Sequence, residues 1–330
     1  MSQIHPLDLH EIRSIIASSL GLQDLASCAR VSRDWNDSFT PPLYNSVVLS
    51  KHHLSMESVE RNKHLIRRLN IHSSAYEKLS STSARDNLIF TVMANATLTT
   101  LTLNYNSIGA IGAQALSEAL KTNSTLTTLD LWENSIGDNG TQGLAEALKT
   151  NSTLTTLVLD FNSVGDNGAQ VLAEALKANL TLTTLTMEDN SIEVNGAQAL
   201  AEALMTNSTL TTLGLRGNSI GDNGAQALAK ALKINSTLTT LVLGDCWIGD
   251  NGAQALAEAL ETNSTLTTLG LGFNSIGDNG AQTLAKALKT NSTLITLGLD
   301  FNSIGDNGVQ ALAEALKTNS TVTIPGIYDE

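Results

Sequence analysis

Residues 151–178 read NSTLTTLVLDFNSVGDNGAQVLAEALKA, and near-copies of this stretch fill most of the chain. Eight complete copies begin at residues 95, 123, 151, 179, 207, 235, 263 and 291, and a partial ninth begins at Asn319. Self-similarity at a fixed period of this length is typical of a solenoid, in which neighbouring copies stack and bury a shared core. Residues 95–326 are therefore predicted to form one repeat array, and positions within a copy are numbered from its opening Asn.

Each copy predicts one strand followed by one helix. Around Leu157 leucines alternate with polar residues, which is typical of a short strand whose leucines face a core. Asn162 then supplies an amide that can bond backbone groups at the turn leaving the strand. Asp166 is placed to cap the N-terminus of a helix, in which apolar residues recur at helical spacing from Ala169 to Leu176.

Stacking such units puts parallel strands on one side and helices on the other, so the predicted fold class is an α/β solenoid. Because helices are wider than strands, the stack is expected to curve into a horseshoe whose concave face is lined by strands. The pattern Leu-x-x-Leu-x-Leu-x-x-Asn, with a helical second half, resembles the ribonuclease-inhibitor-like class of leucine-rich repeats. That resemblance implies a concave face that binds protein.

The copies differ most at positions eight, ten and eleven, which we predict to be strand positions that point away from the core, onto the concave face. Aromatic rings among carboxylates suit a partner that has basic and apolar groups. Unselected drift of surface positions is the alternative explanation of this variation. The predicted partner-binding residues are Tyr105, Trp132, Glu133, Asp160, Phe161, Glu188, Asp189, Arg216, Asp245, Phe273, Asp300 and Phe301.

Two copies depart from the shared pattern. Cys246 replaces the turn Asn of the sixth copy, and we predict a structural role for it, because cysteine is a recognised substitute for that Asn in the repeat family. The fourth copy has Glu193 and Val194 where Gly and the capping Asp stand in most copies. The acidic residues near Glu193 lack the regular spacing of a calcium loop, so no metal site is predicted.

The charge balance argues against several classes of ligand. Residues 95–330 hold nine Lys/Arg against 23 Asp/Glu, a surface that repels nucleic acid and anionic membranes and attracts basic proteins. All six histidines lie before residue 95 and no catalytic or cofactor motif appears, so we predict a non-enzyme without cofactors. Because no signal peptide, long apolar run or cysteine framework is visible, we expect the cytoplasm or nucleus. By itself the chain is expected to be a monomer.

Residues 4–49 do not share the repeat and are predicted to form a small all-α domain of two or three short helices. Glu11, Leu20, Asp24, Leu25, Val31, Arg33 and Trp35 resemble the F-box in identity and spacing. One departure is visible, since the usual Leu-Pro opening appears as Leu9-His10. The resemblance implies docking on a Skp-type adaptor of a cullin ubiquitin ligase through Leu9, Ile12, Ile16, Leu20, Leu25, Val31 and Trp35.

Residues 50–94 are predicted to be a linker and a degenerate first repeat, with a strand at 65–71 and a helix near 88–93. Val322 and Ile324 are predicted to form a last strand, and residues 327–330 a tail. The predicted function is substrate recognition for a Skp-cullin-F-box ubiquitin ligase, with the protein target held on the concave face. The alternative is a stand-alone leucine-rich repeat scaffold or inhibitor whose N-terminal helices act as a cap.

Overall fold

The structure, a computed structural model, describes residues 46–49, 63–72 and 92–325. Within these residues ten strands form one parallel sheet, in which each strand pairs with the next one along the chain. The strands are β1 (Ser46–Leu49), β2 (Arg68–Ile71), β3 (Thr100–Thr102), β4 (Thr128–Asp130), β5 (Thr156–Val158), β6 (Thr184–Thr186), β7 (Thr212–Gly214), β8 (Thr240–Val242), β9 (Thr268–Gly270) and β10 (Thr296–Gly298). This in-order parallel sheet confirms the predicted solenoid.

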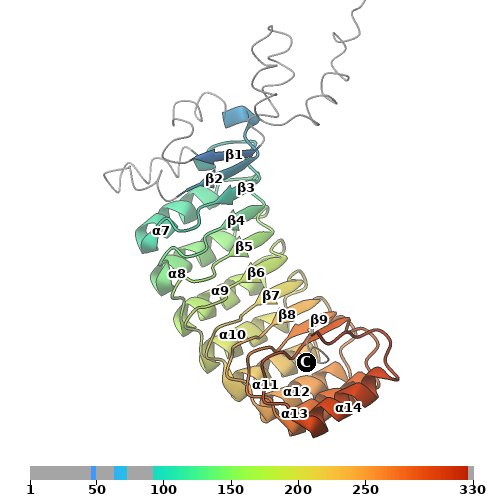
Figure 1. Ribbon diagram of the computed structural model, residues 1–330. Helices are drawn as coiled ribbons and strands as arrows, with labels where there is room; N and C mark the ends of the chain where they lie inside the picture. The colour runs from blue at the N-terminus through green and yellow to red at the C-terminus, as the bar shows by residue number, and fades with distance from the viewer. Residues whose placement is uncertain (1–45, 50–62, 73–91, 326–330) are drawn as a thin grey trace, which may run out of the picture.

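Helices alternate with the strands from β3 onward. They are α7 (Gly109–Leu120), α8 (Gly137–Leu148), α9 (Asp166–Ala178), α10 (Val194–Leu204), α11 (Gly221–Leu232), α12 (Asp250–Leu260), α13 (Asp278–Leu288) and α14 (Asp306–Leu316). Figure 1 shows a curved stack, with the strands along its inner side and the helices along its outer side. The strand-lined inner side is the concave face.

The core lies between the sheet and the helices and is built mainly from leucine and alanine. In the third copy Leu154, Leu157 and Leu159 come from the strand side, Leu172 and Leu176 come from α9, and each is at most 1% exposed. Every full copy repeats this arrangement, so one layer of side chains continues into the next. The alternation of leucine with polar residues therefore predicted the buried face of each strand correctly.

The side chain of the turn Asn at position twelve ties each copy to the preceding one. The side-chain amide of Asn162 donates to the carbonyl oxygens of Leu131, at 2.8 Å, and Asp160, at 3.0 Å. Its side-chain oxygen accepts from the backbone N–H groups of Asn134, at 3.0 Å, and Ile136, at 3.2 Å. The turn cannot make these hydrogen bonds with its own backbone groups, so a side chain has to make them. A side chain with both a donor and an acceptor is therefore best suited to this position.

Cys246 takes the place of that Asn and is fully buried. Its thiol lies 3.2 Å from the carbonyl oxygen of Leu215 and 3.3 Å from that of Gly244, the same pair of carbonyls that an Asn amide would bond. Burial raises the pKa of this thiol to about 12, which keeps it protonated and unreactive at neutral pH. The structure thus confirms the predicted structural role of Cys246.

The opening Asn of each copy forms a second ladder on the opposite edge of the stack. The amide of Asn151 donates to the carbonyl oxygens of Leu120, at 2.8 Å, and Asn123, at 3.1 Å. Its side-chain oxygen accepts from the N–H groups of Thr153 and Leu154. Because this amide is buried and fully bonded, the recurring Asn-x-Thr belongs to the architecture of the repeat.

The prediction that Asp166 caps its own helix was wrong. Asp166 is the first residue of α9, and no side chain caps that helix from its own copy. Its carboxylate instead accepts from the backbone N–H groups of Glu193, at 2.7 Å, and Gly196, at 2.8 Å, at the start of α10. The same bonds to the next helix are made by Asp138, Asp222, Asp250 and Asp278. A helix N-terminus needs acceptors for its free N–H groups, and here the preceding copy supplies them.

The residue at position fifteen adopts one of two backbone conformations, and the preceding Asp decides which. Where an Asp is present the backbone is extended, as at Glu193 with φ −108° and Gly249 with φ −104°. Where the preceding copy has Ala110 or Val194 instead, Gly137 and Gly221 have φ +60°. This explains why the fourth copy can carry Glu193 without strain, since an extended backbone accepts any side chain.

The ends of the sheet differ from the predicted boundaries. Strand β1 lies inside the range 4–49 assigned to the helical domain and pairs with β2, so its four residues belong to the solenoid. They escaped notice because the alternation of buried Val47 and exposed Val48 is too short to stand out. Strand β2 confirms the strand of the degenerate first repeat. The predicted last strand is a single bridge between Thr296 and Thr323. The predicted F-box helices and residues 73–91 lie outside the described residues.

Candidate protein-binding surface

The variable positions lie at one edge of the concave face, but only position eight is in a strand. Each strand from β3 to β10 ends there, and positions ten and eleven form the turn that follows. Position eleven has a left-handed backbone in all eight copies, for example φ 61° at Tyr105, 56° at Phe161 and 57° at Phe273. Because positive φ cannot continue a pleated strand, position eleven belongs to the turn, three residues after the end of each strand.

Three of the predicted rings form an N-terminal aromatic cluster, defined as Tyr105, Trp132 and Phe161. The rings of Tyr105 and Trp132 have centroids 4.4 Å apart and an interplanar angle of 85°. Trp132 and Phe161 are 5.3 Å apart at 83°. These edge-to-face contacts link three successive copies, and Tyr105 is still 50% exposed. The cluster therefore presents a broad aromatic surface to solvent.

A C-terminal aromatic cluster, defined as Arg216, Phe273 and Phe301, lies at the other end of the array. Phe273 and Phe301 stack with their centroids 4.3 Å apart and an interplanar angle of 20°. The guanidinium carbon of Arg216 lies 5.6 Å from the centroid of Phe273, close enough for a cation–π interaction. Arg216 and Glu188 occupy position ten of successive copies, which suggests an ion pair, but no N–O contact within 4 Å joins the two among the described residues.

Between the two clusters lies an acidic centre, defined as Asp160, Glu188 and Asp189. Burial raises the pKa of Asp160, although the N–H of Glu188 donates to its carboxylate at 2.7 Å. Burial and the neighbouring charge of Asp160 raise the pKa of Glu188, and burial raises that of Asp189. The charge of Arg216 opposes the last two shifts. Three partly desolvated carboxylates thus face solvent without enough positive charge to balance them.

The remaining predicted residues also lie on this edge. Glu133 and Asp245 are exposed at position eleven, with φ of 52° at each. Asp300 is half-buried beside Gly272, where an added Cβ would meet its carboxylate oxygen at 2.6 Å. The close approach of Asp300 leaves little room for a side chain at position 272.

Two residues of this region were absent from the predicted set. Asp130, at position eight, accepts a hydrogen bond from the amide of Asn104 at 3.0 Å and adds to the acidic charge beside Asp160. Trp247 occupies position thirteen, which is Ser in the other copies, and is 73% exposed with φ 60°. A comparison of the copies at every position, rather than at the most variable ones, would have identified Trp247.

The aromatic residues at position eleven stay there against a conformational penalty. The left-handed conformation costs a residue with a Cβ about 1–2 kcal/mol of conformational free energy, and glycine largely avoids that cost. Gly217 shows that glycine fits this position, with φ +69°. Tyr105, Phe161 and Phe273 are nevertheless aromatic and about half exposed. Neither burial nor backbone preference therefore accounts for the rings at this position.

The comparisons agree with this architecture. The family model described as Leucine Rich repeat matches residues 94–117, 122–145, 150–173, 178–201, 206–229, 235–257, 262–285 and 290–313. These segments cover more than half of the chain, which therefore belongs to the leucine-rich repeat family. Membership indicates a protein-interaction scaffold, and proteins of this kind are generally not enzymes.

No curated protein matches the chain. Among solved structures, leiomodin-1 actin-binding site 2 is 27% identical with a TM-score of 0.39, and the match covers 45% of this chain and 87% of that one. The tropomodulin C-terminal domain of Caenorhabditis elegans is 17% identical with a TM-score of 0.40, covering 46% of this chain and 92% of that one.

Two further observations concern the described residues alone. None of their helices is long and apolar enough to cross a membrane. They also contain no group of three or more His, Cys, Asp or Glu side chains arranged to hold a metal ion.

Proposed function

We propose that this chain is a protein-interaction adaptor that binds a basic, extended protein segment across its concave face. The observation that carries the proposal is the arrangement of the two aromatic clusters on either side of the acidic centre. Rings at both ends can hold apolar side chains, and the partly desolvated carboxylates between them outnumber Arg216, the cation that acts on two of them. A partner with lysine or arginine between two apolar anchors satisfies both requirements.

The spacing of the clusters sets the length of that segment. Phe161 belongs to the third copy and Phe273 to the seventh, so four strand spacings separate them. At about 4.8 Å per strand they lie roughly 19 Å apart along the sheet, which an extended chain spans with about six residues. The proposed ligand therefore has two apolar side chains about six residues apart, with basic residues between them.

This part of the proposal is tested by affinity capture from cell extract with the wild-type chain and the Trp132→Ala/Phe161→Ala/Phe273→Ala variant. Proteins that depend on the concave face are retained by the wild type and lost by the variant. A matched control is Ile295→Thr, which removes an exposed apolar side chain at position five and restores the residue of the other copies. Equal recovery of every protein by all three chains would refute the proposal.

We further propose that the concave face serves a Skp-cullin-F-box ubiquitin ligase. The support is the register of the seven F-box-like residues from Glu11 to Trp35, together with a repeat array that can hold a target. The 28-residue period and helical second half favour the ribonuclease-inhibitor-like class of repeats for that array. The competing proposal is a scaffold or inhibitor whose first 49 residues only cap the solenoid.

Co-purification with a recombinant Skp-type adaptor separates these two proposals. The ligase proposal predicts a stable complex that Leu25→Asp and Trp35→Ala each weaken, with capture by the concave face unchanged. A chain that binds no adaptor, and whose residues 46–330, which keep β1, become insoluble without the first 45, would instead support the cap.

A further inference from the structure

Three successive loops on the edge opposite the variable turns break the repeat in the same way. These loops join a helix to the next strand, and they read Lys-Thr-Asn-Ser or Glu-Thr-Asn-Ser at residues 121–124, 149–152, 261–264, 289–292 and 317–320. After α9, α10 and α11 they read Lys-Ala-Asn-Leu, Met-Thr-Asn-Ser and Lys-Ile-Asn-Ser. Each of the three therefore gains one large apolar residue, and we call Leu180, Met205 and Ile234 the edge patch.

Hydrogen bonds of the opening asparagines place these loops on adjacent rungs. The amide of Asn207 donates to the carbonyl oxygens of Leu176, at 2.8 Å, and Asn179, at 3.4 Å. The amide of Asn235 donates in the same way to Asn207, at 3.1 Å. Each of these asparagines is next to, or two residues from, a member of the edge patch. The three apolar side chains thus belong to consecutive layers of one edge.

The edge patch is open to solvent. Leu180 is 73% exposed, Ile234 is 61% exposed and Met205 is 37% exposed. Single exposed apolar residues are common on protein surfaces, but these three lie in consecutive layers, at positions that are small or polar in the other copies.

The substitutions also give up hydrogen bonds and ion pairs that most other copies keep. Thr at position twenty-eight donates to a helix carbonyl, as Thr206 does to Ala203 at 3.3 Å, and Ile234 has no hydroxyl to do so. Lys at position twenty-seven pairs with Glu three residues earlier, as Lys149 does with Glu146 at 2.6 Å. Met205 removes that lysine from the fourth copy. Neither change improves the folded chain by itself, so a gain in stability does not explain the patch.

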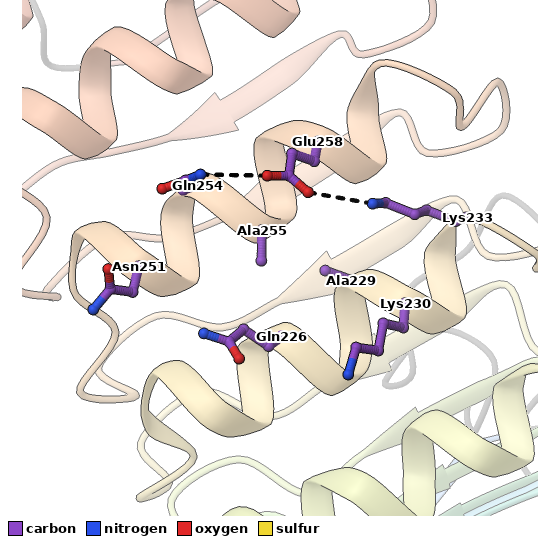
Figure 2. A pocket seen from close by; sticks show the side chains of 8 residues that line it. All are labelled: Gln226, Ala229, Lys230, Lys233, Asn251, Gln254, Ala255 and Glu258. Atoms are coloured by element: carbon purple, nitrogen blue, oxygen red, sulfur yellow. Dashed lines mark hydrogen bonds and ion pairs between the residues drawn. The ribbon is translucent and has the colours of Figure 1, made fainter.

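Charges of both signs lie around the edge patch, since Lys177 pairs with Glu174 at 2.7 Å and also feels the charge of Glu202. Lys177 and Lys233 occupy position twenty-seven in the layers on either side of Met205. Position twenty-four of the fifth copy is Lys230, where most copies have Glu. Figure 2 shows Lys230 and Lys233 on α11 and at its end, beside a groove of about 300 Å³ between α11 and α12. Lys233 reaches across this groove to Glu258 at 3.4 Å, whereas Lys230 makes no ion pair within 4 Å among the described residues.

We propose that the edge patch is a second docking surface, separate from the concave face, for a protein segment that carries apolar side chains flanked by aspartate or glutamate. The aliphatic side chains of the patch provide the apolar contact area. Lys230, which unlike Lys177 and Lys233 is not already paired with a glutamate among the described residues, selects acidic over basic flanking residues. The two surfaces therefore bind partners of opposite charge, which suits a scaffold that holds two proteins at once.

The test is a display selection with a random peptide library on the full-length wild-type chain, counter-selected on Leu180→Ser/Met205→Lys/Ile234→Thr. This variant restores residues that the other copies already carry, so it is expected to fold at least as well as the wild type, which thermal unfolding checks. The proposal predicts enriched peptides with apolar residues next to Asp or Glu. Absence of enrichment over the counter-selected variant, or enrichment of lysine-rich peptides, would overturn it.

An enriched peptide, labelled for fluorescence anisotropy, then measures the effect. The triple reversion is expected to weaken its binding roughly tenfold or more, as loss of a central apolar contact does. Ile295→Thr, an equally consensus-restoring change outside the patch, and Trp132→Ala/Phe161→Ala/Phe273→Ala should leave binding unchanged. If the concave-face variant abolishes this binding instead, the edge patch is not the site. A concentration-dependent dimer of the wild type that the reversion removes would assign the patch to a second copy and contradict the proposal.

Discussion

Gly221 and Val194 test the rule that an Asp in one copy sets the backbone before the next helix. Val194 occupies the Asp position of the fourth copy, and Gly221 in the following copy has φ +60°. A Cβ added at Gly221 would meet open space, since no heavy atom would lie within 4 Å of it. A double-mutant cycle of Gly221→Ala and Val194→Asp therefore separates backbone strain from steric clash.

The expected energies follow from the two conformations. Gly221→Ala alone places a Cβ in the left-handed region, which should lower the free energy of unfolding by about 1–2 kcal/mol. The less flexible unfolded chain offsets about 0.4–1 kcal/mol of that loss. Val194→Asp should stabilise by about 1 kcal/mol, because its carboxylate can cap α11 as Asp222 caps α12. In that background the backbone at Gly221 becomes extended, so the same change to Ala should be neutral or favourable.

Equilibrium urea unfolding of the four chains gives the coupling free energy. We expect about 1–2 kcal/mol of favourable coupling, well above the roughly 0.5 kcal/mol scatter of independent sites. Gly249→Ala is the matched control, since Gly249 is already extended and a Cβ there would lie 3.5 Å from the nearest oxygen of Asp222. Additive free energies, or a destabilised Gly249→Ala chain, would show the rule to be wrong.

Three further predictions concern single residues. Asp222→Ala removes the acceptor of two helix N–H groups and should lower the free energy of unfolding by about 1–2 kcal/mol in urea titrations. Cys246→Asn should stabilise by about 1 kcal/mol, because an amide oxygen is a better acceptor than sulfur for the neighbouring turn, and in the wild type iodoacetamide at pH 8 should modify Cys246 only after unfolding. Burial raises the folded pKa of Glu188, so stability falls as pH rises from the unfolded pKa of this group to its folded pKa. Glu188→Gln should therefore raise the free energy of unfolding at pH 7 by up to about 0.5 kcal/mol and make that free energy less dependent on pH. The same change should weaken the binding of basic peptides.

The periodicity of the sequence predicted the fold because each position meets the same surroundings in every copy. Leu157 is buried for the same reason as Leu185 and Leu213, so one copy describes the others. The strand and helix of each copy, the turn Asn and the replacement by Cys246 could all be inferred from side-chain chemistry.

What the sequence did not reveal depends on contacts between copies. In the sequence Asp166 stands where a residue could cap its own helix, α9. In the structure its carboxylate bonds the N-terminus of the next helix, α10. Position eleven alternates like a strand residue in the sequence, but its left-handed backbone makes it a turn. Neither feature can be read from a single copy, because both depend on how the neighbouring layer is positioned.

The candidate site was predicted in composition but not in organisation. The sequence indicated which rings and carboxylates vary, whereas the edge-to-face contact of Tyr105 with Trp132 and the stacking of Phe273 on Phe301 required the register of the layers. Arg216 was expected near carboxylates, and its charge does act on Glu188 and Asp189. Its guanidinium also lies over the ring of Phe273, two copies further toward the C-terminus, and that contact was not predicted.

The most direct test of the binding surface is the affinity of the chain for a synthetic peptide that has two phenylalanines about six residues apart with lysines between them. We expect binding that weakens with added salt, falls roughly tenfold or more in Trp132→Ala/Phe161→Ala/Phe273→Ala, and is unaffected by the reversion of the edge patch. Equal affinity of the wild type and the triple-alanine variant would contradict the proposed surface.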